Sequence, residues 1–198
     1  YAEQFPGNVN GIILRGVFTM TKAELDWVYT KNGAAKFLPE AWRLFEGIIP
    51  ESERSDLISA YHRRLFGSSP SEQAKYARAW TVWENSLASF NSFGSGYTPS
   101  IEYAKAFARI ENHYFINECF LESNEQLLRD LHLIKNIPTI IVQGRFDMIC
   151  PPETAEKIHR SLRNSKLILV KDAGHAMSEP NISVELIKAT NEFKNLKG

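Results

Sequence analysis

Two side chains in the last third of the sequence, Asp147 and His175, are of types that move protons. Each follows a run of β-forming residues, Ile137–Gly144 and Lys166–Val170, and the spacing leaves room for one helix and one strand between them. If these runs are neighbouring parallel strands, their carboxyl ends deliver both side chains to one sheet edge, where ligand sites lie. An aspartate there can accept the imidazole Nδ1–H, fix its tautomer and stabilise the imidazolium during acyl transfer. The alternative is that Asp147 caps the following helix and His175 is an ordinary loop histidine.

The sequence does not supply the nucleophile that such a pair would serve. A serine of this kind commonly sits at a strand-to-helix turn of the form G-x-S-x-G. Gly94-Ser95-Gly96 has the wrong spacing and no strand before it, and no other serine lies between two glycines at that spacing. Cys150 follows Asp147, so the usual order of nucleophile, acid and histidine argues against it. The first residues lack an initiator Met and resemble the end of a helix broken at Pro6, so we expect the chain to begin inside a larger protein.

Two glutamates, Glu84 and Glu111, lie on apolar faces of predicted helices. Glu111 falls near the centre of a stripe formed by Ala104, Phe107, Ala108 and Phe115, and Glu84 at the edge of one formed by Tyr76, Trp80, Trp83, Leu87 and Phe90. An ionised carboxylate on a packed apolar face needs a cation or several donors. One explanation is structural: an internal arginine such as Arg15 or Arg109 pairs with a glutamate, or Glu84 reaches solvent. The other is that both carboxylates and nearby aromatic rings bind a small ammonium ligand with an apolar body.

The hydrophobic pattern divides the sequence into three blocks, residues 1–20, 21–132 and 133–198. The first contains an apolar run, Val9–Phe18, that predicts a buried strand, and the third predicts strand, helix, strand, helix. Continuous apolar strands that alternate with helices indicate an α/β fold with a parallel sheet. The middle block predicts helices almost throughout. The helices expected are Lys22–Asn32, Glu40–Gly47, Glu53–Phe66, Ser71–Phe90, Ile101–Asn117, Pro152–Leu162 and Val184–Leu196, with a loop at Asn91–Ser100.

Composition and charge exclude several classes of protein. The net charge is +0, from 23 basic and 23 acidic residues, which gives no basic surface for nucleic acid or for a membrane. No apolar run is long enough to span a bilayer. Cys119 and Cys150 could form one disulfide, but so few cysteines favour a reducing compartment, and we expect a cytoplasmic protein. The five histidines have no metal-ligand spacing, so we expect neither a metal nor another cofactor.

Five strings, taken in order, closely resemble the proline iminopeptidases, serine peptidases of the α/β-hydrolase fold that release N-terminal proline. They are LRGVF (14–18), WTVWEN (80–85), FARIENHYF (107–115), VQGRFDMICP (142–151) and DAGHAMSEP (172–180). The resemblance implies the C-terminal part of a mainly parallel sheet, residues 1–20 and 133–198, with a helical cap inserted at residues 21–132. The family carries a Gly-rich oxyanion loop and a GGSWGS-like nucleophile turn upstream of these strings. The resemblance therefore implies that this chain starts shortly after the serine and is inactive alone.

The resemblance implies catalytic roles. Asp147 would be the acid and His175 the base of a Ser-His-Asp triad, and Cys150 would be a non-catalytic thiol beside the acid. The reaction would pass through a prolyl-enzyme ester that water hydrolyses. Asp147 and His175 would serve equally in another capped hydrolase, such as an epoxide hydrolase or an esterase. A relative that has lost the nucleophile would be an inactive binding protein.

The resemblance implies a proline pocket as well. The residues that match the family's binding positions are Glu84 and Glu111 for the free α-amino group, Phe18 and Phe115 for the walls of the pyrrolidine pocket, and Arg15 for the charges nearby. Two carboxylates that demand a protonated amine would reject internal peptide bonds. The expected partners are therefore peptides with a free N-terminal proline. Relatives tend to have an aromatic residue where this chain has Val28, and Tyr29 is the candidate substitute.

Overall fold

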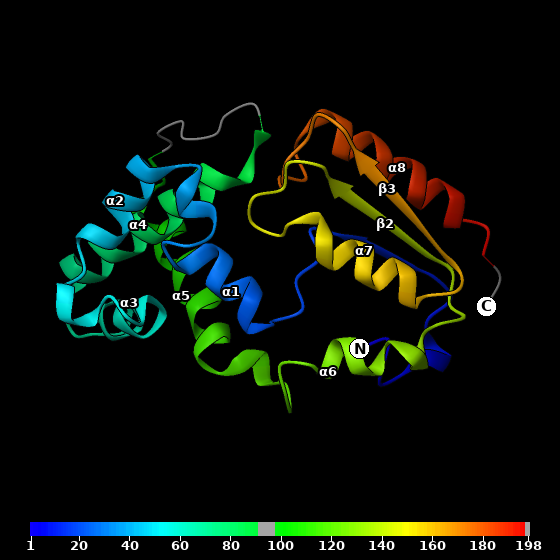
Figure 1. Ribbon diagram of the computed structural model, residues 1–198, viewed down its shortest axis with the longest axis horizontal. Coiled ribbons are helices and arrows are strands. Elements are labelled where there is room, and N and C mark those ends of the chain that lie inside the picture. Colours follow the sequence, from blue (N-terminus) through cyan, green and yellow to red (C-terminus); the bar gives the residue numbers. More distant parts are fainter. Residues whose placement is uncertain (91–97, 197–198) are drawn as a thin grey trace. The chain divides into compact units, whose positions relative to one another are not determined.

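The computed structural model describes residues 1–90 and 98–196 (Figure 1). Gly94-Ser95-Gly96 and most of the predicted loop Asn91–Ser100 lie outside the described residues. The chain forms two compact units. The sheet unit comprises residues 1–21, 88–90 and 124–196, and the helical unit comprises residues 22–87 and 98–123. The helical unit is thus an insertion between the first and second strands of the sheet unit.

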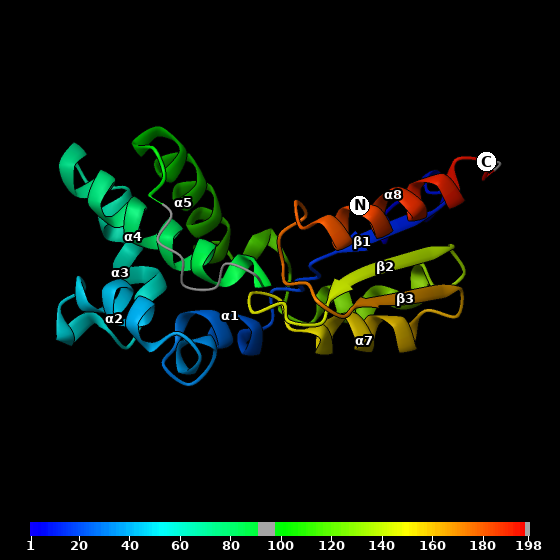
Figure 2. The same cartoon turned by 90° about the horizontal axis from the view of Figure 1, so that it is seen from above.

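The sheet consists of three parallel strands in the order β1-β2-β3 (Figure 2). They are β1 (Ile12–Arg15), β2 (Thr139–Gly144) and β3 (Ser165–Val170). Leu14 pairs with Ile141, which pairs in turn with Leu167, and every residue of β2 is buried. A strand covered on both faces needs apolar residues at successive positions, which is why β2 is a nearly continuous apolar run. The predicted α/β fold with a parallel sheet is confirmed.

Two helices, α7 (Pro152–Ser161) and α8 (Pro180–Phe193), cover opposite faces of this sheet (Figures 1 and 2). Successive side chains of a strand point to opposite faces. Accordingly, Ile141 packs in the apolar cluster of α7, whereas Ile140 and Val142 pack in that of α8. Burial of each such side chain stabilises the fold by about 1.5–3 kcal/mol, so β2 anchors both layers.

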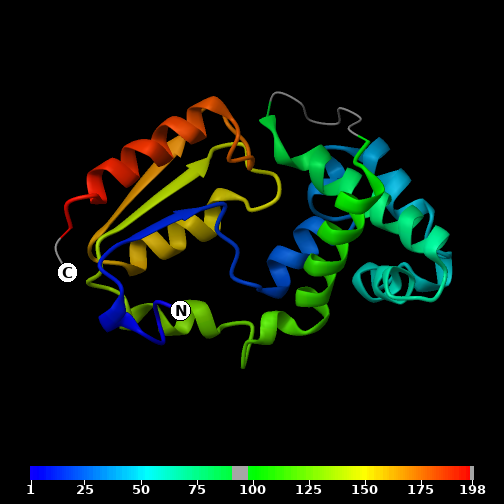
Figure 3. The ribbon, with the colours of Figure 1, turned by 180° about the vertical axis from the view of Figure 1, so that it is seen from behind.

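A short helical segment completes the apolar cluster on the α7 side. It comprises α6 (Gln126–Arg129) and a 3-10 turn at Asp130–Leu133, and the N-terminal residues run beside it (Figure 3). An apolar cavity of about 190 Å³ lies there, lined in part by Leu14, Phe18 and Leu131. The predicted block boundary at residue 132 falls near the end of this segment. In the structure, residues 124–132 belong to the sheet unit, because Leu131 packs in the same cluster as α7.

The helical unit has an aromatic core. Its helices are α1 (Lys22–Tyr29), α2 (Pro39–Gly47), α3 (Leu57–Leu65), α4 (Pro70–Ala88, whose last residue is assigned to the sheet unit) and α5 (Ile101–Ile116), with 3-10 turns at Ala34–Lys36, Glu51–Glu53 and Glu118–Phe120. Phe45, Tyr61, Trp80 and Trp83 are each at most 1% exposed. The rings of Phe45 and Tyr61 stack with centroids 4.6 Å apart. Such pairs contribute about 0.5–1.5 kcal/mol beyond the area they bury, so these rings fix how the helices pack.

Local chemistry explains where two helices depart from the predicted bounds. The predicted helix Glu53–Phe66 is broken before α3, because Asp56 Oδ1 accepts the Ser59 N–H at 3.0 Å and caps a new helix. The last helix begins at Pro180 and not at the predicted Val184, since proline suits the first turn of a helix.

Three further properties bear on function. The disulfide that the sequence allows between Cys119 and Cys150 is not formed. Within the described part of the chain, no helix is both long and apolar enough to cross a membrane. Residues 1–90 and 98–196 contain no group of three or more histidine, cysteine and acidic side chains placed to hold a metal ion.

Candidate active site

The carboxyl ends of β2 and β3 bring Asp147 and His175 together. The Nδ1 atom of His175 lies 3.1 Å from Oδ1 and 3.0 Å from Oδ2 of Asp147. The Asp147 side chain is 1% exposed and the His175 side chain 20% exposed, so the acid is enclosed while the imidazole remains accessible. An aspartate so placed accepts the Nδ1–H and leaves Nε2 as the proton-accepting atom. The pair can therefore act as an orienting acid and a general base.

Asp147 holds a turn as well as the histidine, but it does not cap α7, whose N-cap residue is Pro151 and which has no side-chain capping bond. Its Oδ1 accepts the backbone N–H of Ile149 at 3.1 Å and of Cys150 at 2.8 Å. Its Oδ2 accepts an amide N–H of Gln143 at 3.0 Å. These donors compensate the burial of the charge. The bonds that close the turn before α7 thus also hold the carboxylate beside His175.

The main chain of His175 is held from two sides. The guanidinium of Arg15, the last residue of β1, donates to the His175 carbonyl oxygen. The His175 N–H donates to the Ala88 carbonyl oxygen at 2.8 Å. Gly16 lies against the ring, because a Cβ at this position would lie 2.7 Å from the imidazole Cε1. Arg15 therefore contacts the histidine loop, whereas the resemblance implied that it organises the charges of an amine pocket.

Glu84 and Glu111 lie together in the helical unit, on either side of the Tyr29 hydroxyl. Tyr29 donates to Glu84 Oε1 and also hydrogen-bonds to Glu111. Trp80 Nε1 donates to Glu111 Oε2 at 2.6 Å. Glu84 is 4% exposed, so the structural alternative in which it reaches solvent is wrong. Glu111 is partly buried as a residue, but its carboxyl group is enclosed. This desolvation raises the pKa of Glu111 to about 7, although its hydrogen bonds with Trp80 and Tyr29 act to lower it.

Aromatic rings surround these two carboxylates. The ring of Tyr29 stacks on Trp80 at 4.7 Å between centroids and meets Phe115 edge-on at 5.5 Å. Arg109, considered as a structural partner for Glu111, lies instead 4.7 Å over the ring of Phe66. Two enclosed carboxylates among ring faces suit a small cation with an apolar body.

The remaining predicted pocket residues lie in separate units. Phe18 belongs to the sheet unit, where it lines the apolar cavity beside α6. Phe115 belongs to the helical unit, where it lies beside Tyr29. Val28 is buried, and its carbonyl oxygen accepts the Trp83 indole N–H at 3.1 Å. The aromatic ring next to the carboxylates therefore comes from Tyr29, the residue after Val28.

Sequence reasoning missed the supporting roles of Gly16, Trp80, Gln143 and Glu179. A polar residue inside an otherwise apolar buried strand is a usable signal, and it could have indicated Gln143. Helical periodicity predicts Trp80 as a core residue. Periodicity does not distinguish a ring that only packs in the core from one that also donates a hydrogen bond to a carboxylate. Glu179 is bonded to Gly174 and Phe90, contacts that only the folded chain creates.

Comparison with known sequences finds a matching family model and several similar proteins. The model of the alpha/beta hydrolase fold family matches residues 1–181. The chain is 43% identical to a proline iminopeptidase of Arabidopsis thaliana, 43% identical to a probable proline iminopeptidase of Leptolyngbya boryana and 34% identical to a proline iminopeptidase of Neisseria gonorrhoeae. These matches cover 100%, 98% and 98% of this chain, but 53%, 60% and 61% of the relatives. The chain thus spans a little over half the length of these curated relatives.

Two solved structures are similar along the whole chain. MGS-M2, an alpha/beta hydrolase enzyme from a Medee basin deep-sea metagenome library, matches with a TM-score of 0.51 at 14% identity and is covered over 60% of its length. The juvenile hormone epoxide hydrolase of the silkworm Bombyx mori matches with a TM-score of 0.50 at 16% identity and is covered over 52%. At these identities the likeness concerns the fold alone. With the family match and the parallel sheet between α7 and α8, it leads to one assignment: the chain belongs to the α/β-hydrolase fold family.

Proposed function

We propose that these residues form the C-terminal part of a serine aminopeptidase that releases N-terminal proline from peptides. The names of the relatives support this activity, and they match along nearly all of the chain. The observation that carries the substrate class is the pair of enclosed carboxylates, Glu84 and Glu111, joined by the Tyr29 hydroxyl.

In the proposed reaction His175 is the base and Asp147 its orienting acid. A serine outside these 198 residues attacks the carbonyl carbon of the terminal proline, and its proton passes to Nε2 of His175. The imidazolium, held by Asp147, gives that proton to the leaving amine as the C–N bond breaks and the prolyl-enzyme ester forms. Water, deprotonated by the same imidazole, then hydrolyses the ester. The bond from His175 Nδ1 to Asp147 supports these roles because it fixes the tautomer that both proton transfers need.

Glu84 and Glu111 are proposed to bind the protonated proline nitrogen. A secondary ammonium has two N–H donors, one for each carboxylate, and its positive charge favours ionisation of the buried pair. The rings of Tyr29 and Phe115 suit the apolar pyrrolidine body. An internal peptide nitrogen carries no charge and would leave these carboxylates uncompensated, which explains why the proposed enzyme acts only at a free amino terminus.

The test is Glu111→Gln in the complete protein. For a prolyl arylamide with a free amino group, kcat/KM is expected to fall about 10- to 100-fold, mainly through KM, because a charge-assisted bond is lost. Glu102→Gln is the matched control, since Glu102 is exposed in the first turn of the same helix. It should leave both constants unchanged.

The same enzyme should not cleave an N-acylated prolyl arylamide. Equal turnover of the free and acylated substrates would remove the amine-binding role of Glu84 and Glu111. It would favour a general esterase that uses only Asp147 and His175.

A further inference from the structure

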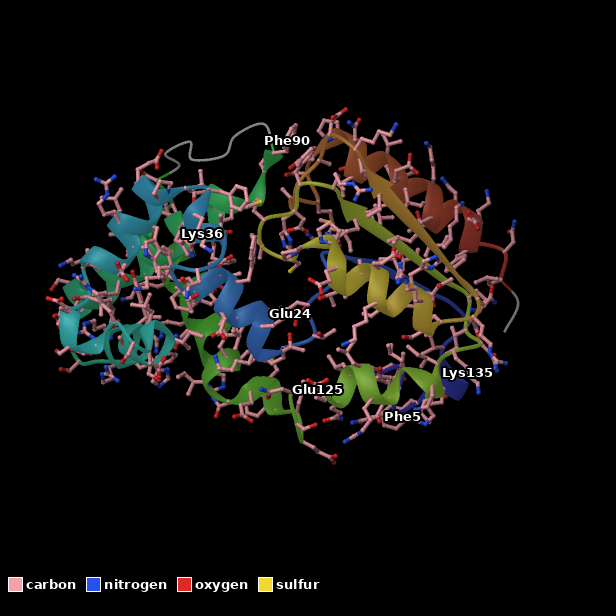
Figure 4. The ribbon with its side chains drawn as sticks, viewed as in Figure 1. Phe5, Glu24, Lys36, Phe90, Glu125 and Lys135 are labelled. Atoms are coloured by element: carbon pink, nitrogen blue, oxygen red, sulfur yellow. The ribbon has the colours of Figure 1, made fainter. Side chains whose placement is uncertain are left out.

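The buried carboxylate of Glu179 joins two parts of the sheet unit that lie far apart in the sequence. Glu179 directly precedes α8 and is 6% exposed. Both of its carboxylate oxygens lie 3.1 Å from the Gly174 backbone nitrogen, and Oε1 accepts the Phe90 N–H at 2.9 Å. Phe90 accordingly lies beside the start of α8 in Figure 4. The side chain makes no capping bond to α8, so its charge is stabilised by backbone donors from these two segments.

The same two segments hold the main chain of His175. The N–H groups of His175 and Ala176 donate to the Ala88 carbonyl oxygen at 2.8 and 2.7 Å. Gly174 also lies close to Glu179 and Phe90. A Cβ at Gly174 would lie 2.9 Å from the Phe90 backbone nitrogen and 3.1 Å from Glu179 Oε1, so a larger residue would disturb the contact between Phe90 and Glu179. Glu179 thus holds the backbone directly before His175 through its hydrogen bond with Gly174.

The second segment also packs beside the acid. The ring of Phe90 stacks on Phe146 with centroids 4.5 Å apart, and Phe146 directly precedes Asp147. The Glu179 carboxylate is therefore hydrogen-bonded both to Gly174, the residue before His175, and to Phe90, which packs next to the turn of Asp147. These contacts link the loop of His175 to the turn of Asp147.

We propose that Glu179 is a positioning residue for His175. Its carboxylate holds the 174–175 peptide against residues 88–90 and thereby sets the distance and angle between the imidazole and Asp147. This inference rests on the proposed role of His175 as the base. A displacement of about 1 Å in a catalytic group, caused by a mutation far from the chemistry, can lower the rate about 100-fold.

The test is Glu179→Gln in the complete protein. One oxygen becomes an NH2 group. Because both oxygens lie 3.1 Å from the Gly174 nitrogen, this NH2 group faces the Gly174 N–H as a second donor in either orientation of the amide, so the hold on Gly174 is weakened. On a prolyl arylamide, kcat is expected to fall about 10- to 100-fold while KM changes less than about twofold. The proton resonance of the His175 Nδ1–H, identified by its absence in His175→Ala, is expected to shift or to broaden.

Glu192→Gln is the matched control, because Glu192 is exposed on α8, the helix that Glu179 precedes, and pairs with Lys166 at the surface. It removes the same charge and should leave kcat and the resonance unchanged. Glu179→Gln with the melting temperature, kcat and resonance of the unmutated protein would overturn the proposal. So would a loss of kcat that matches a loss of folded protein while the resonance of the folded fraction stays unchanged.

If Glu179→Gln does not fold, Glu179→Asp is measured in the same way. It keeps both oxygens on a side chain shorter by one methylene, so a smaller loss of kcat and a smaller shift of the resonance are expected, and no change in either would overturn the proposal. The resonance is observed without substrate. An unmutated protein that shows the resonance but releases no proline would reject the proposed function, and the effect of Glu179→Gln on the resonance would still decide the role of Glu179.

Discussion

At the scale of single residues, the histidine loop depends on contacts that leave no space for a larger side chain. Gly16 has a φ of +55°, which residues with a Cβ rarely adopt, and its missing Cβ would lie 2.7 Å from the His175 ring. Gly16→Ala is expected to lower the free energy of unfolding by about 1–2 kcal/mol through backbone strain. It is also expected to lower kcat at least about tenfold, because the ring must move relative to Asp147. Chemical denaturation and steady-state kinetics measure the two effects.

Gly7→Ala is the control for this substitution, since nothing lies within 4 Å of the added methyl group at that site. It should change neither stability nor kcat appreciably. Were Gly16→Ala as active as Gly7→Ala, the imidazole would have freedom to move without loss of function. Gly16 would then be required for the turn after β1 and not for the histidine.

At the scale of secondary-structure elements, the start of α3 depends on one side chain. Asp56 Oδ1 accepts the Ser59 N–H at 3.0 Å, while Asp56 itself is exposed. Asp56→Ala is expected to lower the free energy of unfolding by about 1 kcal/mol, because a backbone donor in the first turn loses its partner. Asp56→Asn keeps an acceptor oxygen and should recover most of the loss. Equal destabilisation by both substitutions in urea titrations would assign the effect to charge and not to the cap.

The elements show which features of a sequence predict structure and which do not. β2 was predictable because a strand buried on both faces must be apolar at nearly every position, and Glu111 stood out because helical period places it on an apolar face. Helical periodicity predicts Tyr29 as a core residue like any other, so its hydrogen bonds with Glu84 and Glu111 could not be inferred. Glu179 gave no signal, since its donors come from distant segments. Periodicity reports burial, whereas the partners of a buried polar group are fixed only by tertiary structure.

At the scale of the whole molecule, the enclosed carboxyl of Glu111 makes stability depend on pH. Its pKa in the folded chain is raised to about 7 by burial, above the ordinary value of 4.5 that the unfolded chain retains. The folded state therefore holds this proton more tightly, and its stabilising effect is fully present below about pH 4.5 and is lost as pH rises through about 7. Glu53 has the opposite sign, because hydrogen bonds from Arg64 and Arg63 lower its pKa to about 2. The titration of Glu53 changes stability only at lower pH, so it does not obscure the effect of Glu111 above pH 5.

Glu111→Gln should remove this dependence. The difference in the free energy of unfolding between Glu111→Gln and the unmutated protein is expected to change by roughly 1–3 kcal/mol between pH 5 and pH 8, with the unmutated protein losing more stability as pH rises. Urea denaturation at both pH values measures it, and Glu102→Gln, on the exposed side of the same helix, should behave as the unmutated protein does. Prolinamide, which carries the proposed ammonium group, should restore stability to the unmutated protein at pH 8 and not to Glu111→Gln. If the free energy of unfolding varied with pH in the same way in both proteins, Glu111 would be ionised in the folded state without a ligand. A bound cation would then not be needed to keep Glu111 charged.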